Sequence, residues 1–579
     1  MLEPHIATPA CVTEDAFAAL MEISKRPPVV FVEGRGSWLT DQEGKKYLDF
    51  IQGWAVNCLG HCPTAIVSAI KSQAEQLLNC SPAYYNAPMI RLAELIARYS
   101  GLHRTFFTNS GAEAIEGAIK LARKWGQIHR GGAYEIVTMH HGFHGRTLAA
   151  MSASGKAQWE HLFEPKVRGF RKVRLNDIEQ VERAITANTV AVMLEPIQGE
   201  AGVFVASDAF LRDLRALTKR HGILLILDEI QTGIGRTGTL FAFQHAGVEP
   251  DVMVLAKGLG GGIPLGALVA HKDACCFAYG DQGGTFNGNA FATAVGCAVL
   301  EEIAKPGFLA GVVEAGAHLA KRLTELSQQY QCAEVRGRGL LLALNLQSEI
   351  GPQVVGLALQ RGLLINAPRT DTLRFMPALT VTRQEIDRMI AILGEVLKEF
   401  SIATECGFGR RPAETIPQLP SHPCRDSGVA MTAQIAIRPL RLDERAAWEP
   451  LWKGYLDFYR ITAPQETYDA TWARLHDPNE PMWLLGGYVD GKLLGIVHYI
   501  YHRSCWTIGD YCYLQDLFVA EGTRKLGLGR ALIEAVYEAA RAAGASRVHW
   551  LTHETNAVAR SLYDTLADRP GFIQYRKLF

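Results

Sequence analysis

Two hydrophobic patterns alternate along the first part of the chain. Short uninterrupted apolar runs, which suit strands buried on both faces, occur at residues 133–139, 190–194, 223–227 and 252–256. Between these runs lie amphipathic stretches with helical spacing, such as residues 112–125 and 210–221. This alternation is typical of a largely parallel sheet covered by helices, so we predict an α/β fold.

The pattern breaks near Ser401. Residues 401–433 contain four prolines and little apolar periodicity, which is typical of a linker. A second α/β pattern then continues to the end of the chain. We therefore predict two domains, residues 1–400 and 434–579, joined by a linker at 401–433.

Composition narrows the function classes. The 579 residues include 59 Lys+Arg and 59 Asp+Glu, so no net positive charge favours nucleic acid. No apolar stretch is long enough to span a bilayer, and residues 1–28 lack the apolar core of a signal peptide. The 12 cysteines are scattered without a Cys-x-x-Cys pair, which favours reduced thiols over disulfides or a zinc site. We expect a cytoplasmic protein that binds neither nucleic acid nor membrane.

Two ionisable residues end apolar runs of the first domain. Asp228 follows ILLIL, and Lys257 follows VMVLA. Open α/β sheets bind ligands at the carboxyl ends of their strands. A desolvated lysine there has a lowered pKa and can form a Schiff base with an aldehyde, while a carboxylate can keep a pyridine nitrogen protonated. This pair is what pyridoxal phosphate requires.

A phosphate cradle is predicted at Ser110, Gly111 and Ala112. These residues follow the apolar run RTFFTN and open the helical segment that starts at Glu113. Free backbone N–H groups at a helix start, with a hydroxyl beside them, can bind a phosphate. Taken alone, the same residues would be interpreted as an ordinary helix N-cap.

Five motifs occur in order in the first domain: SGAEA from Ser110, FHGRT from Phe143, EPIQGE from Glu195, DEIQTGIGRTG from Asp228 and LAKGLGGGIPLGA from Leu255. With these motifs the domain resembles class III, fold-type I aminotransferases over residues 24–400. The segments GWAVNCLGH from Gly53 and LRFMPALTVT from Leu373 most resemble the bacterial acetylornithine aminotransferases, with ornithine, succinylornithine and 4-aminobutyrate aminotransferases as near neighbours. The resemblance implies a large sheet domain and a small α/β domain from about residue 310.

The resemblance also implies roles for the cofactor-binding residues. Lys257 carries the cofactor and shuttles the proton, and Asp228 pairs with the pyridine nitrogen. Gln231 approaches the ring hydroxyl, while Ile230 and Phe143 pack on opposite faces of the ring.

The implied phosphate site needs a second subunit. Gly111 and Ala112 bind phosphate through their backbone, and Thr285 reaches the phosphate of the neighbouring subunit, which implies a homodimer with interfacial sites. Two features depart from the family. Ala112 stands where many relatives have threonine, and GGTFNGN, which contains Thr285, differs from the commoner GGN pattern.

The family resemblance assigns substrate recognition to two arginines. Their planar guanidinium groups can bind carboxylates bidentately. Arg146 matches the position that binds the carboxylate of the ω-amino donor. Arg374 matches the one that binds the α-carboxylate of glutamate or 2-oxoglutarate, and Glu200 matches a carboxylate that occupies Arg374 when the donor is bound.

Each assignment has a structural alternative. Lys257 and Asp228 could be structural ions, Phe143 a core aromatic and Glu200 an ordinary ion-pair partner. Four histidines without a complete ligand set are predicted to be solvated or hydrogen-bonded and not metal ligands, so no metal is expected: His61, His140, His141 and His144.

The second domain contains a basic glycine loop. Residues 513–519 read as a strand, Arg524, Gly527 and Gly529 follow, and residues 530–543 form an amphipathic helix. Glycines and basic groups at a helix start allow a phosphate to approach the backbone, although tight strand–helix turns also use glycine.

The spacing Arg-x-x-Gly-x-Gly resembles the pyrophosphate loop of GNAT acetyltransferases, and the match continues to the end of the chain. It implies that Leu517 to Val519 and residues 524–529 bind acetyl-CoA. Tyr563 would protonate the leaving thiolate, or else be a packed aromatic. No residue stands out as the base for the acceptor amine.

We therefore predict a bifunctional enzyme. The first domain would move the ω-amino group of N-acetylornithine to 2-oxoglutarate, and the second would acetylate an unidentified amine. The alternatives are ornithine, succinylornithine or 4-aminobutyrate as donor, and a second domain that only senses acetyl-CoA. A pyridoxal-phosphate-binding transcription regulator would need a DNA-binding module, which the sequence does not contain.

Overall fold

The computed structural model divides the chain into two compact units, Met1–Ala413 and Glu414–Phe579. The described residues are 17, 19–21, 23–24, 26–405, 435–458, 462–477, 480–503, 509–520, 527–552, 556, 559, 562–563 and 566–567. Among the described residues, no helix is both long and apolar enough to cross a membrane.

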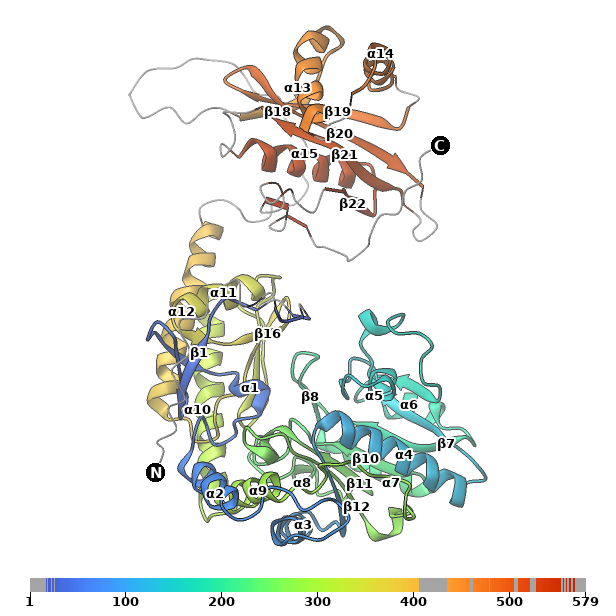
Figure 1. Ribbon diagram of the computed structural model, residues 1–579, viewed down its shortest axis with the longest axis vertical. Helices are drawn as coiled ribbons and strands as arrows, with labels where there is room; N and C mark the ends of the chain where they lie inside the picture. The colour runs from blue at the N-terminus through green and yellow to red at the C-terminus, as the bar shows by residue number, and fades with distance from the viewer. Residues whose placement is uncertain are drawn as a thin grey trace. The chain divides into compact units, whose positions relative to one another are not determined.

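The centre of the first unit is a seven-stranded sheet (Figure 1). Its strand order is β4-β12-β11-β10-β7-β5-β6. The strand β12 is antiparallel to both of its neighbours, and the other neighbouring pairs are parallel. The predicted apolar runs all lie in this sheet. The strands are β4 (Arg104–Thr108), β5 (Glu135–Met139), β6 (Phe170–Val173), β7 (Thr189–Leu194), β10 (Leu224–Asp228), β11 (Val252–Leu255) and β12 (Gly266–Ala270).

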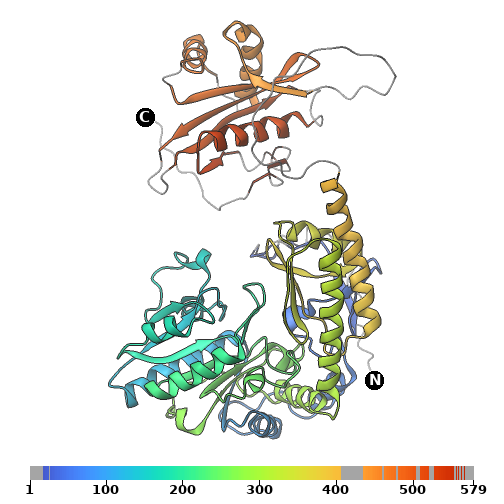
Figure 2. The same ribbon diagram turned by 180° about the vertical axis from the view of Figure 1, so that it is seen from behind.

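Helices cover both faces of this sheet. The helix α4 (Gly111–His129) packs on residues such as Ile136 and Ile226, and α7 (Asp208–His221) packs on the alternate residues, such as Val137 and Leu225. Figures 1 and 2 show the two helices on opposite faces. Strand side chains alternate between faces, so a sheet covered on both sides must be apolar throughout, which explains the continuous apolar runs.

Two smaller sheets complete the first unit. One has the order β1-β2-β3-β15 and the other β13-β14-β17-β16, and β8 and β9 form a separate hairpin. The bounds are β1 (Phe31–Arg35), β2 (Trp38–Asp41), β3 (Lys46–Asp49), β8 (Ile197–Gln198), β9 (Phe204–Val205), β13 (Val335–Arg338), β14 (Leu341–Asn345), β15 (Leu363–Leu364), β16 (Asn366–Arg369) and β17 (Thr372–Phe375). Because β3 pairs with β15, the beginning of the chain joins the part that follows residue 310.

The remaining helices surround these sheets. They are α1 (Gln52–Ala55), α2 (Thr64–Ala74), α3 (Ala87–Ser100), α5 (Leu148–Ala153), α6 (Ile178–Ala184), α8 (Phe243–Ala246), α9 (Ala290–Ile303), α10 (Phe308–Gln329), α11 (Gly351–Gln360) and α12 (Arg383–Glu405), with the short turns η2 (Ala157–Trp159), η3 (Lys257–Gly260) and η4 (Lys272–Ala274). The helix α12 runs five residues beyond position 400, into the predicted linker. The rest of that linker lies outside the described residues.

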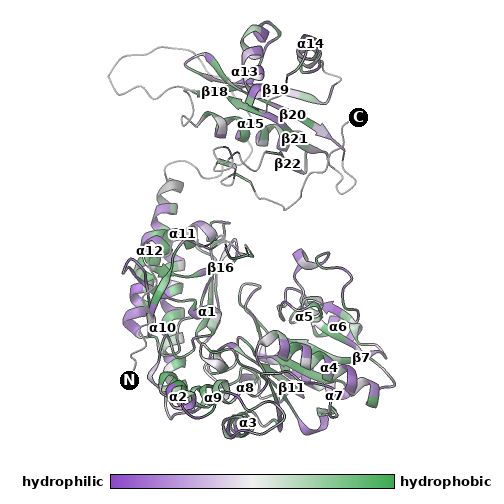
Figure 3. Ribbon diagram, viewed as in Figure 1, coloured by the Kyte–Doolittle hydropathy of each residue, from purple (hydrophilic) through white to green (hydrophobic). Residues whose placement is uncertain are grey.

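The second unit has a five-stranded sheet, β18-β19-β20-β21-β22, antiparallel except for the last pair. Helices α13 and α14 cover one face and α15 the other. Its elements are β18 (Ile435–Pro439), η5 (Leu442–Glu444), α13 (Arg445–Phe458), α14 (Gln465–Arg474), β19 (Met482–Val489), β20 (Lys492–His502), β21 (Tyr511–Val519), α15 (Leu528–Ala542) and β22 (Arg547–His549). In both units hydrophobic residues gather in the strands, while helix surfaces such as that of α12 carry polar residues (Figure 3).

Candidate active site

A cavity of about 410 Å³ opens at the carboxyl ends of β5, β7, β10 and β11. These strands are neighbours in the sheet, so the segments that follow them converge. The predicted residues that line the cavity are Ser110, Gly111, Ala112, Phe143, Arg146, Glu200, Asp228, Ile230, Gln231 and Lys257. Arg374 lies directly behind two of them, and Thr285 is exposed and does not line the cavity.

Asp228 is held by a histidine that the motif analysis did not pair with it. The Asp228 carboxylate is 3% exposed, and its Oδ2 lies 2.7 Å from Nδ1 of His144. Burial opposes protonation of His144, but this carboxylate raises the pKa of His144 above its ordinary value. The Nε2 atom of His144 is buried and has no hydrogen-bond partner among the described residues. The histidine therefore fixes the orientation of the Asp228 carboxylate.

Lys257 has an unusual backbone. Its φ of +46° lies in the left-handed region, which a residue with a Cβ rarely adopts and which costs conformational energy. Burial lowers the pKa of the Lys257 ammonium, against the opposing charges of Glu200 and Asp228. A lysine with a lowered pKa is more often neutral, so its nitrogen can act as a nucleophile or as a base.

The start of α4 supplies backbone donors to the cavity. Ser110 is the N-cap residue, and its Oγ accepts a hydrogen bond from the Glu113 N–H at 3.3 Å. Gly111 and Ala112 lie in the first turn, where N–H groups have no acceptor within the helix. A Cβ on Gly111 would lie 2.7 Å from Cδ1 of Ile230, so a larger residue here would displace the Ile230 side chain from the cavity wall. Ser110 is thus an N-cap, and the N–H groups beside it can still bind an anion.

Arg374 and Glu200 form a buried ion pair. Arg374, on β17, has no exposed surface, and its Nη1 lies 2.7 Å from Oε1 of Glu200. Nη1 also donates to Oε1 of Gln231 at 3.3 Å. Nη2 of Arg374 and Nε2 of Gln231 are buried without a partner among the described residues. Unsatisfied buried donors beside a cavity are typical of a site that a ligand completes.

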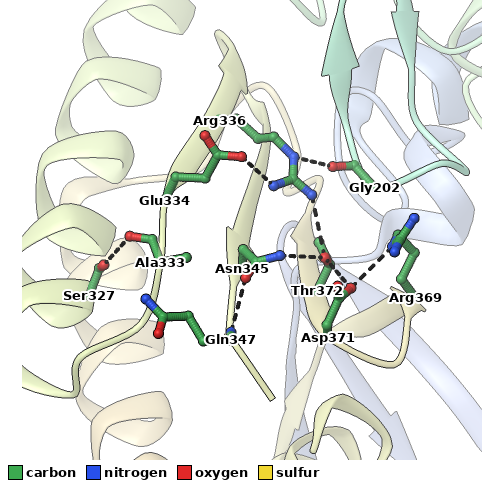
Figure 4. Close-up of polar contacts among 10 residues, drawn as sticks. All are labelled: Gly202, Ser327, Ala333, Glu334, Arg336, Asn345, Gln347, Arg369, Asp371 and Thr372. Carbon is green, nitrogen blue, oxygen red and sulfur yellow. Dashed lines mark hydrogen bonds and ion pairs between the residues drawn. The ribbon is translucent and has the colours of Figure 1, made fainter. Parts of the chain in front are cut away.

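The hairpin that carries Glu200 is tied to the same small sheet (Figure 4). Arg336 on β13 donates from Nε to the Gly202 carbonyl at 2.7 Å and from Nη2 to Thr372 Oγ1 at 3.3 Å. Its guanidinium also lies 4.3 Å from the centre of the Phe204 ring. Sequence reasoning missed Arg336, because nothing in its local pattern indicates a partner 134 residues away.

Arg146 lies in a different environment. It is exposed, and its guanidinium carbon is 4.9 Å from the centre of the Trp159 ring. Trp159 is buried and packs against Phe143, with 5.6 Å between the ring centres. The ammonium of Lys156 lies 5.0 Å from the Phe143 ring and 5.3 Å from the Trp159 ring. Lys156 and Trp159 were not predicted, although they closely follow the FHGRT motif.

A further carboxyl group, Glu195, follows β7. Its Oε2 accepts the Phe143 N–H at 2.8 Å, and burial raises the pKa of Glu195 to about 7. The motif EPIQGE therefore places two glutamates at the cavity, of which the sequence analysis singled out only Glu200.

In the second unit, several of the predicted residues lie in or beside the end of β21. Its pairing with β22 ends at Tyr513, so the backbone from Leu514 to Val519 lacks that neighbour. Gly527 precedes α15 with φ +84°, and Gly529 lies beside the side chains of Val519 and Leu562. Leu517 and Val519 are half-buried in β21. The Tyr563 ring packs edge-on against Trp550, with 5.4 Å between the ring centres. Arg524 lies outside the described residues.

The second unit also contains a buried carboxylate–histidine pair. Oδ2 of Asp516 lies 2.8 Å from Nδ1 of His498 and accepts the Trp452 indole N–H at 3.2 Å. Trp448 donates to Nε2 of His498 at 2.9 Å. Both ring nitrogens of His498 therefore have partners, whereas only Nδ1 of His144 has one among the described residues. This network joins α13 to β20 and β21.

The comparisons with known proteins agree with this geometry. Residues 21–397 match the family described as aminotransferase class-III, and residues 448–567 match the acetyltransferase (GNAT) family. An acetylornithine aminotransferase of Ralstonia nicotianae is 57% identical over 387 residues, covering 66% of this chain and 97% of that protein. Acetylornithine aminotransferase 2 of Bordetella pertussis is 55% identical over 382 residues, covering 66% and 96%.

Solved structures show the same fold for the first unit. The N-acetylornithine aminotransferase from Stenotrophomonas maltophilia superposes with a TM-score of 0.58 at 36% identity, covering 65% of this chain and 98% of that one. The ornithine aminotransferase from Toxoplasma gondii gives a TM-score of 0.64 at 30% identity, covering 68% and 96%. The chain belongs to the class III aminotransferase family and carries a GNAT acetyltransferase domain at its C-terminus.

Proposed function

We propose that the first unit transfers the ω-amino group of N-acetylornithine to 2-oxoglutarate with pyridoxal phosphate. One observation carries this proposal: Lys257 and Asp228 share their cavity with Glu200, which pairs with Arg374 behind it, and with Arg146, which has no carboxylate within 4.0 Å among the described residues. The curated relatives at 55% and 57% identity are named acetylornithine aminotransferases, which supports this donor over ornithine, succinylornithine and 4-aminobutyrate.

The cavity residues fit pyridoxal phosphate. Gly111 and Ala112 would hold the phosphate through their N–H groups, with Ser110 beside them, and Asp228 would pair with the ring nitrogen. The unpartnered Nε2 of Gln231 is available to the ring hydroxyl, and Ile230 and Phe143 would enclose the ring. When bound, the cofactor supplies an aldehyde carbon that takes up the amino group and a protonated ring that accepts electrons.

The protein side chains would then move protons and orient substrate. Lys257, whose pKa burial lowers, would take the proton from the carbon that bears the donor amine and would deliver it to the cofactor carbon that receives the amino group. Asp228, held by His144, keeps the proton on the ring nitrogen. The strained backbone at Lys257 fixes the position of its amine relative to Asp228.

Two different substrates would use the site in turn. Arg146 would bind the carboxylate of the donor, while Glu200 occupies Arg374. When 2-oxoglutarate enters, Glu200 would leave Arg374, which then binds the second carboxylate. The side chain of Glu200 is 23% exposed, so it has room to move toward solvent.

We further propose a cytoplasmic homodimer in which Thr285 of each chain reaches the phosphate site of the other. Its exposed position outside the cavity of its own chain suits this role. The neighbouring Phe286 is 59% exposed, and Tyr84 and Tyr85 are 71% and 86% exposed, as expected for residues that a second subunit covers. The proposed domains are residues 1–400 and 434–579, with a linker between them.

The direct test uses the full-length protein with pyridoxal phosphate. The absorbance of the bound cofactor is followed while N-acetylornithine, ornithine, succinylornithine and 4-aminobutyrate are added separately. N-acetylornithine should convert the cofactor fastest, and 2-oxoglutarate should restore it. Lys257→Ala should abolish both the conversion and turnover, and substantial remaining turnover would refute the site.

For the second unit, we propose acetyl transfer from acetyl-CoA to an amine. Leu517 to Val519 would bind the cosubstrate along the part of β21 that lies beyond its pairing with β22, with Arg524, Gly527 and Gly529 at its pyrophosphate. Tyr563 would protonate the leaving thiolate. Support comes from the GNAT family match and from the early end of the β21–β22 pairing.

The acceptor amine is tested with the isolated second unit and the full chain. Release of free thiol from acetyl-CoA is measured with glutamate, ornithine and polyamines as acceptors. Acetylation of glutamate or ornithine would link the unit to transamination, as in arginine biosynthesis. If acetyl-CoA instead alters transamination without being consumed, the unit is a sensor.

A further inference from the structure

Lys156 lies behind the Phe143 ring, which lines the cavity near Arg146. It follows α5 and precedes η2, and its ammonium contacts the rings of Phe143 and Trp159 at 5.0 and 5.3 Å. Phe143 lines the cavity, and the Arg146 guanidinium carbon lies 4.9 Å from the centre of the Trp159 ring. Two cations therefore share the Trp159 ring, and one of them, Lys156, also contacts the Phe143 ring.

The charge of Lys156 is not neutralised locally. Among the described residues, no carboxylate lies within 4.0 Å of its ammonium, and no oxygen accepts a hydrogen bond from it. The half-buried Lys172 differs, because its Nζ donates to the Ser152 carbonyl at 2.9 Å. Burial lowers the pKa of Lys156, so holding this ammonium in place has a cost that its aromatic contacts offset only in part.

Its electrostatic neighbours place Lys156 at the substrate site. The charges that act on it most strongly are those of Glu200, Arg146, Glu195 and Arg374, which all line the cavity or lie directly behind it. Glu200 is already paired with Arg374 at 2.7 Å. Arg146 and Lys156 therefore place two positive charges at the same end of the site.

We propose that Lys156 is a specificity-determining residue that selects donors with an acylated α-nitrogen over donors with a free α-ammonium. This inference rests on the proposed function, in which Arg146 binds the donor carboxylate. The α-nitrogen is bonded to the carbon next to that carboxylate, so it must lie close to Arg146 and within range of Lys156. A free α-ammonium is repelled there, whereas an acyl group is neutral and offers a carbonyl oxygen to the Lys156 ammonium.

The size of the effect follows from Coulomb's law. Two like charges about 6 Å apart near a protein surface change affinity by roughly a hundredfold, and partial solvent screening reduces this to roughly tenfold. Lys156→Met should thus raise kcat/KM for ornithine, relative to that for N-acetylornithine, by about tenfold. The change should fall mainly on KM, because Lys156 does not contact the reacting end of the donor.

The test compares three donors on the full-length holoenzyme. Ornithine, N-acetylornithine and 4-aminobutyrate all carry a carboxylate, so any loss of attraction to it cancels in the ratios of kcat/KM. 4-Aminobutyrate has no substituent at the α-carbon and should change in parallel with N-acetylornithine, within about threefold.

Two variants separate charge from packing. Lys156→Arg keeps the cation and should keep the wild-type ratio. Lys45→Met removes an ammonium that lies 4.9 Å from the Tyr47 ring, away from the cavity, and should leave the ratio unchanged. Thermal unfolding of each variant shows whether it is folded.

The outcomes distinguish this inference from the proposed function. If no donor converts the cofactor in the wild-type protein, the proposed function fails. If N-acetylornithine reacts but Lys156→Met leaves the ornithine ratio unchanged, or Lys156→Arg shifts it as much as Lys156→Met, the role of Lys156 is refuted and the transaminase remains.

Discussion

The two guanidinium groups at the candidate site differ in what surrounds them. Arg374 is fully buried and pairs with Glu200 at 2.7 Å. Arg146 is exposed and lies 4.9 Å from the Trp159 ring, and among the described residues no carboxylate lies within 4.0 Å of it. One arginine is therefore neutralised by the protein, and the other is not.

This difference bears on how one cavity serves two substrates. An unpaired guanidinium is available to any carboxylate that enters, whereas a paired one binds a new carboxylate only after its partner has left. The Arg146 side would then recognise a carboxylate in both half-reactions, and the Arg374 side only in one. The following substitutions are expected to break or sharpen this contrast.

Arg374→Leu should have the largest effect, because it removes a carboxylate-binding group and leaves Glu200 without its partner. We expect kcat/KM for 2-oxoglutarate to fall by about a thousandfold and the free energy of unfolding to fall by about 3 kcal/mol. Steady-state kinetics and urea unfolding measure the two effects. Unchanged 2-oxoglutarate kinetics in a folded variant would contradict the assignment.

Arg146→Leu should impair the donor half-reaction by about a hundredfold, since a charge-assisted contact to the donor carboxylate is lost. Because Arg146 is exposed, the unfolding free energy should change by less than about 1 kcal/mol. The contrast with Arg374 fails if Arg146→Leu destabilises the fold as strongly as Arg374→Leu. Cofactor absorbance serves as the control for an intact site.

Glu200→Gln tests the pairing through pH. Burial acts to raise the pKa of Glu200, but Arg374 holds it below its ordinary value of 4.5. A lowered carboxyl pKa stabilises the fold above pH 4.5, and this contribution is lost as the pH falls through the lowered pKa. The wild type should therefore lose about 1 kcal/mol more than Glu200→Gln between about pH 5 and pH 3 in urea unfolding. Parallel curves would show that the pair contributes nothing.

Arg336→Met should have the smallest effect, because Arg336 acts through the hairpin that carries Glu200 and touches no substrate. Loss of its bond to the Gly202 carbonyl should loosen Glu200 and change kcat/KM for 2-oxoglutarate by about threefold. The donor half-reaction should change less, and equal changes in both would indicate general damage. Arg322→Met, which removes a half-buried arginine of α10 that pairs with Asp387 at 3.0 Å and does not line the cavity, is a matched control.

Much of the fold was predictable because its signals are local. Both predicted helices of the large sheet form, and each starts earlier than its apolar pattern because a serine caps it: Ser110 for α4 and Ser207 for α7. The antiparallel β12 was not predicted. An apolar run indicates burial, but strand direction depends on the connection.

The candidate site was predictable to a similar degree. Asp228 ends β10, and Lys257 follows the neighbouring parallel strand β11, in which Val254 pairs with Asp228. Their side chains converge because the carboxyl ends of parallel strands lie at the same edge of the sheet. His144 as the partner of Asp228 could not be assigned, because the two are 84 residues apart and three other histidines fitted the sequence equally well.

In the second unit, too, local features were predictable and contacts between distant segments were not. The strand, the glycines and the amphipathic helix α15 were visible in the sequence, since each has a local pattern. The network of Asp516, His498, Trp448 and Trp452 was not, because it connects one helix to two strands.

The sequence by itself therefore determined the elements, their order and the residues with chemistry at the strand ends, because hydrophobic periodicity and turn chemistry act between near neighbours. Only the tertiary structure decided which charges are neutralised. Arg374 meets Glu200 across 174 residues, while Arg146 and Lys156 meet aromatic rings. Electrostatic energy depends on distance and burial, and folding sets both only after distant segments have packed together.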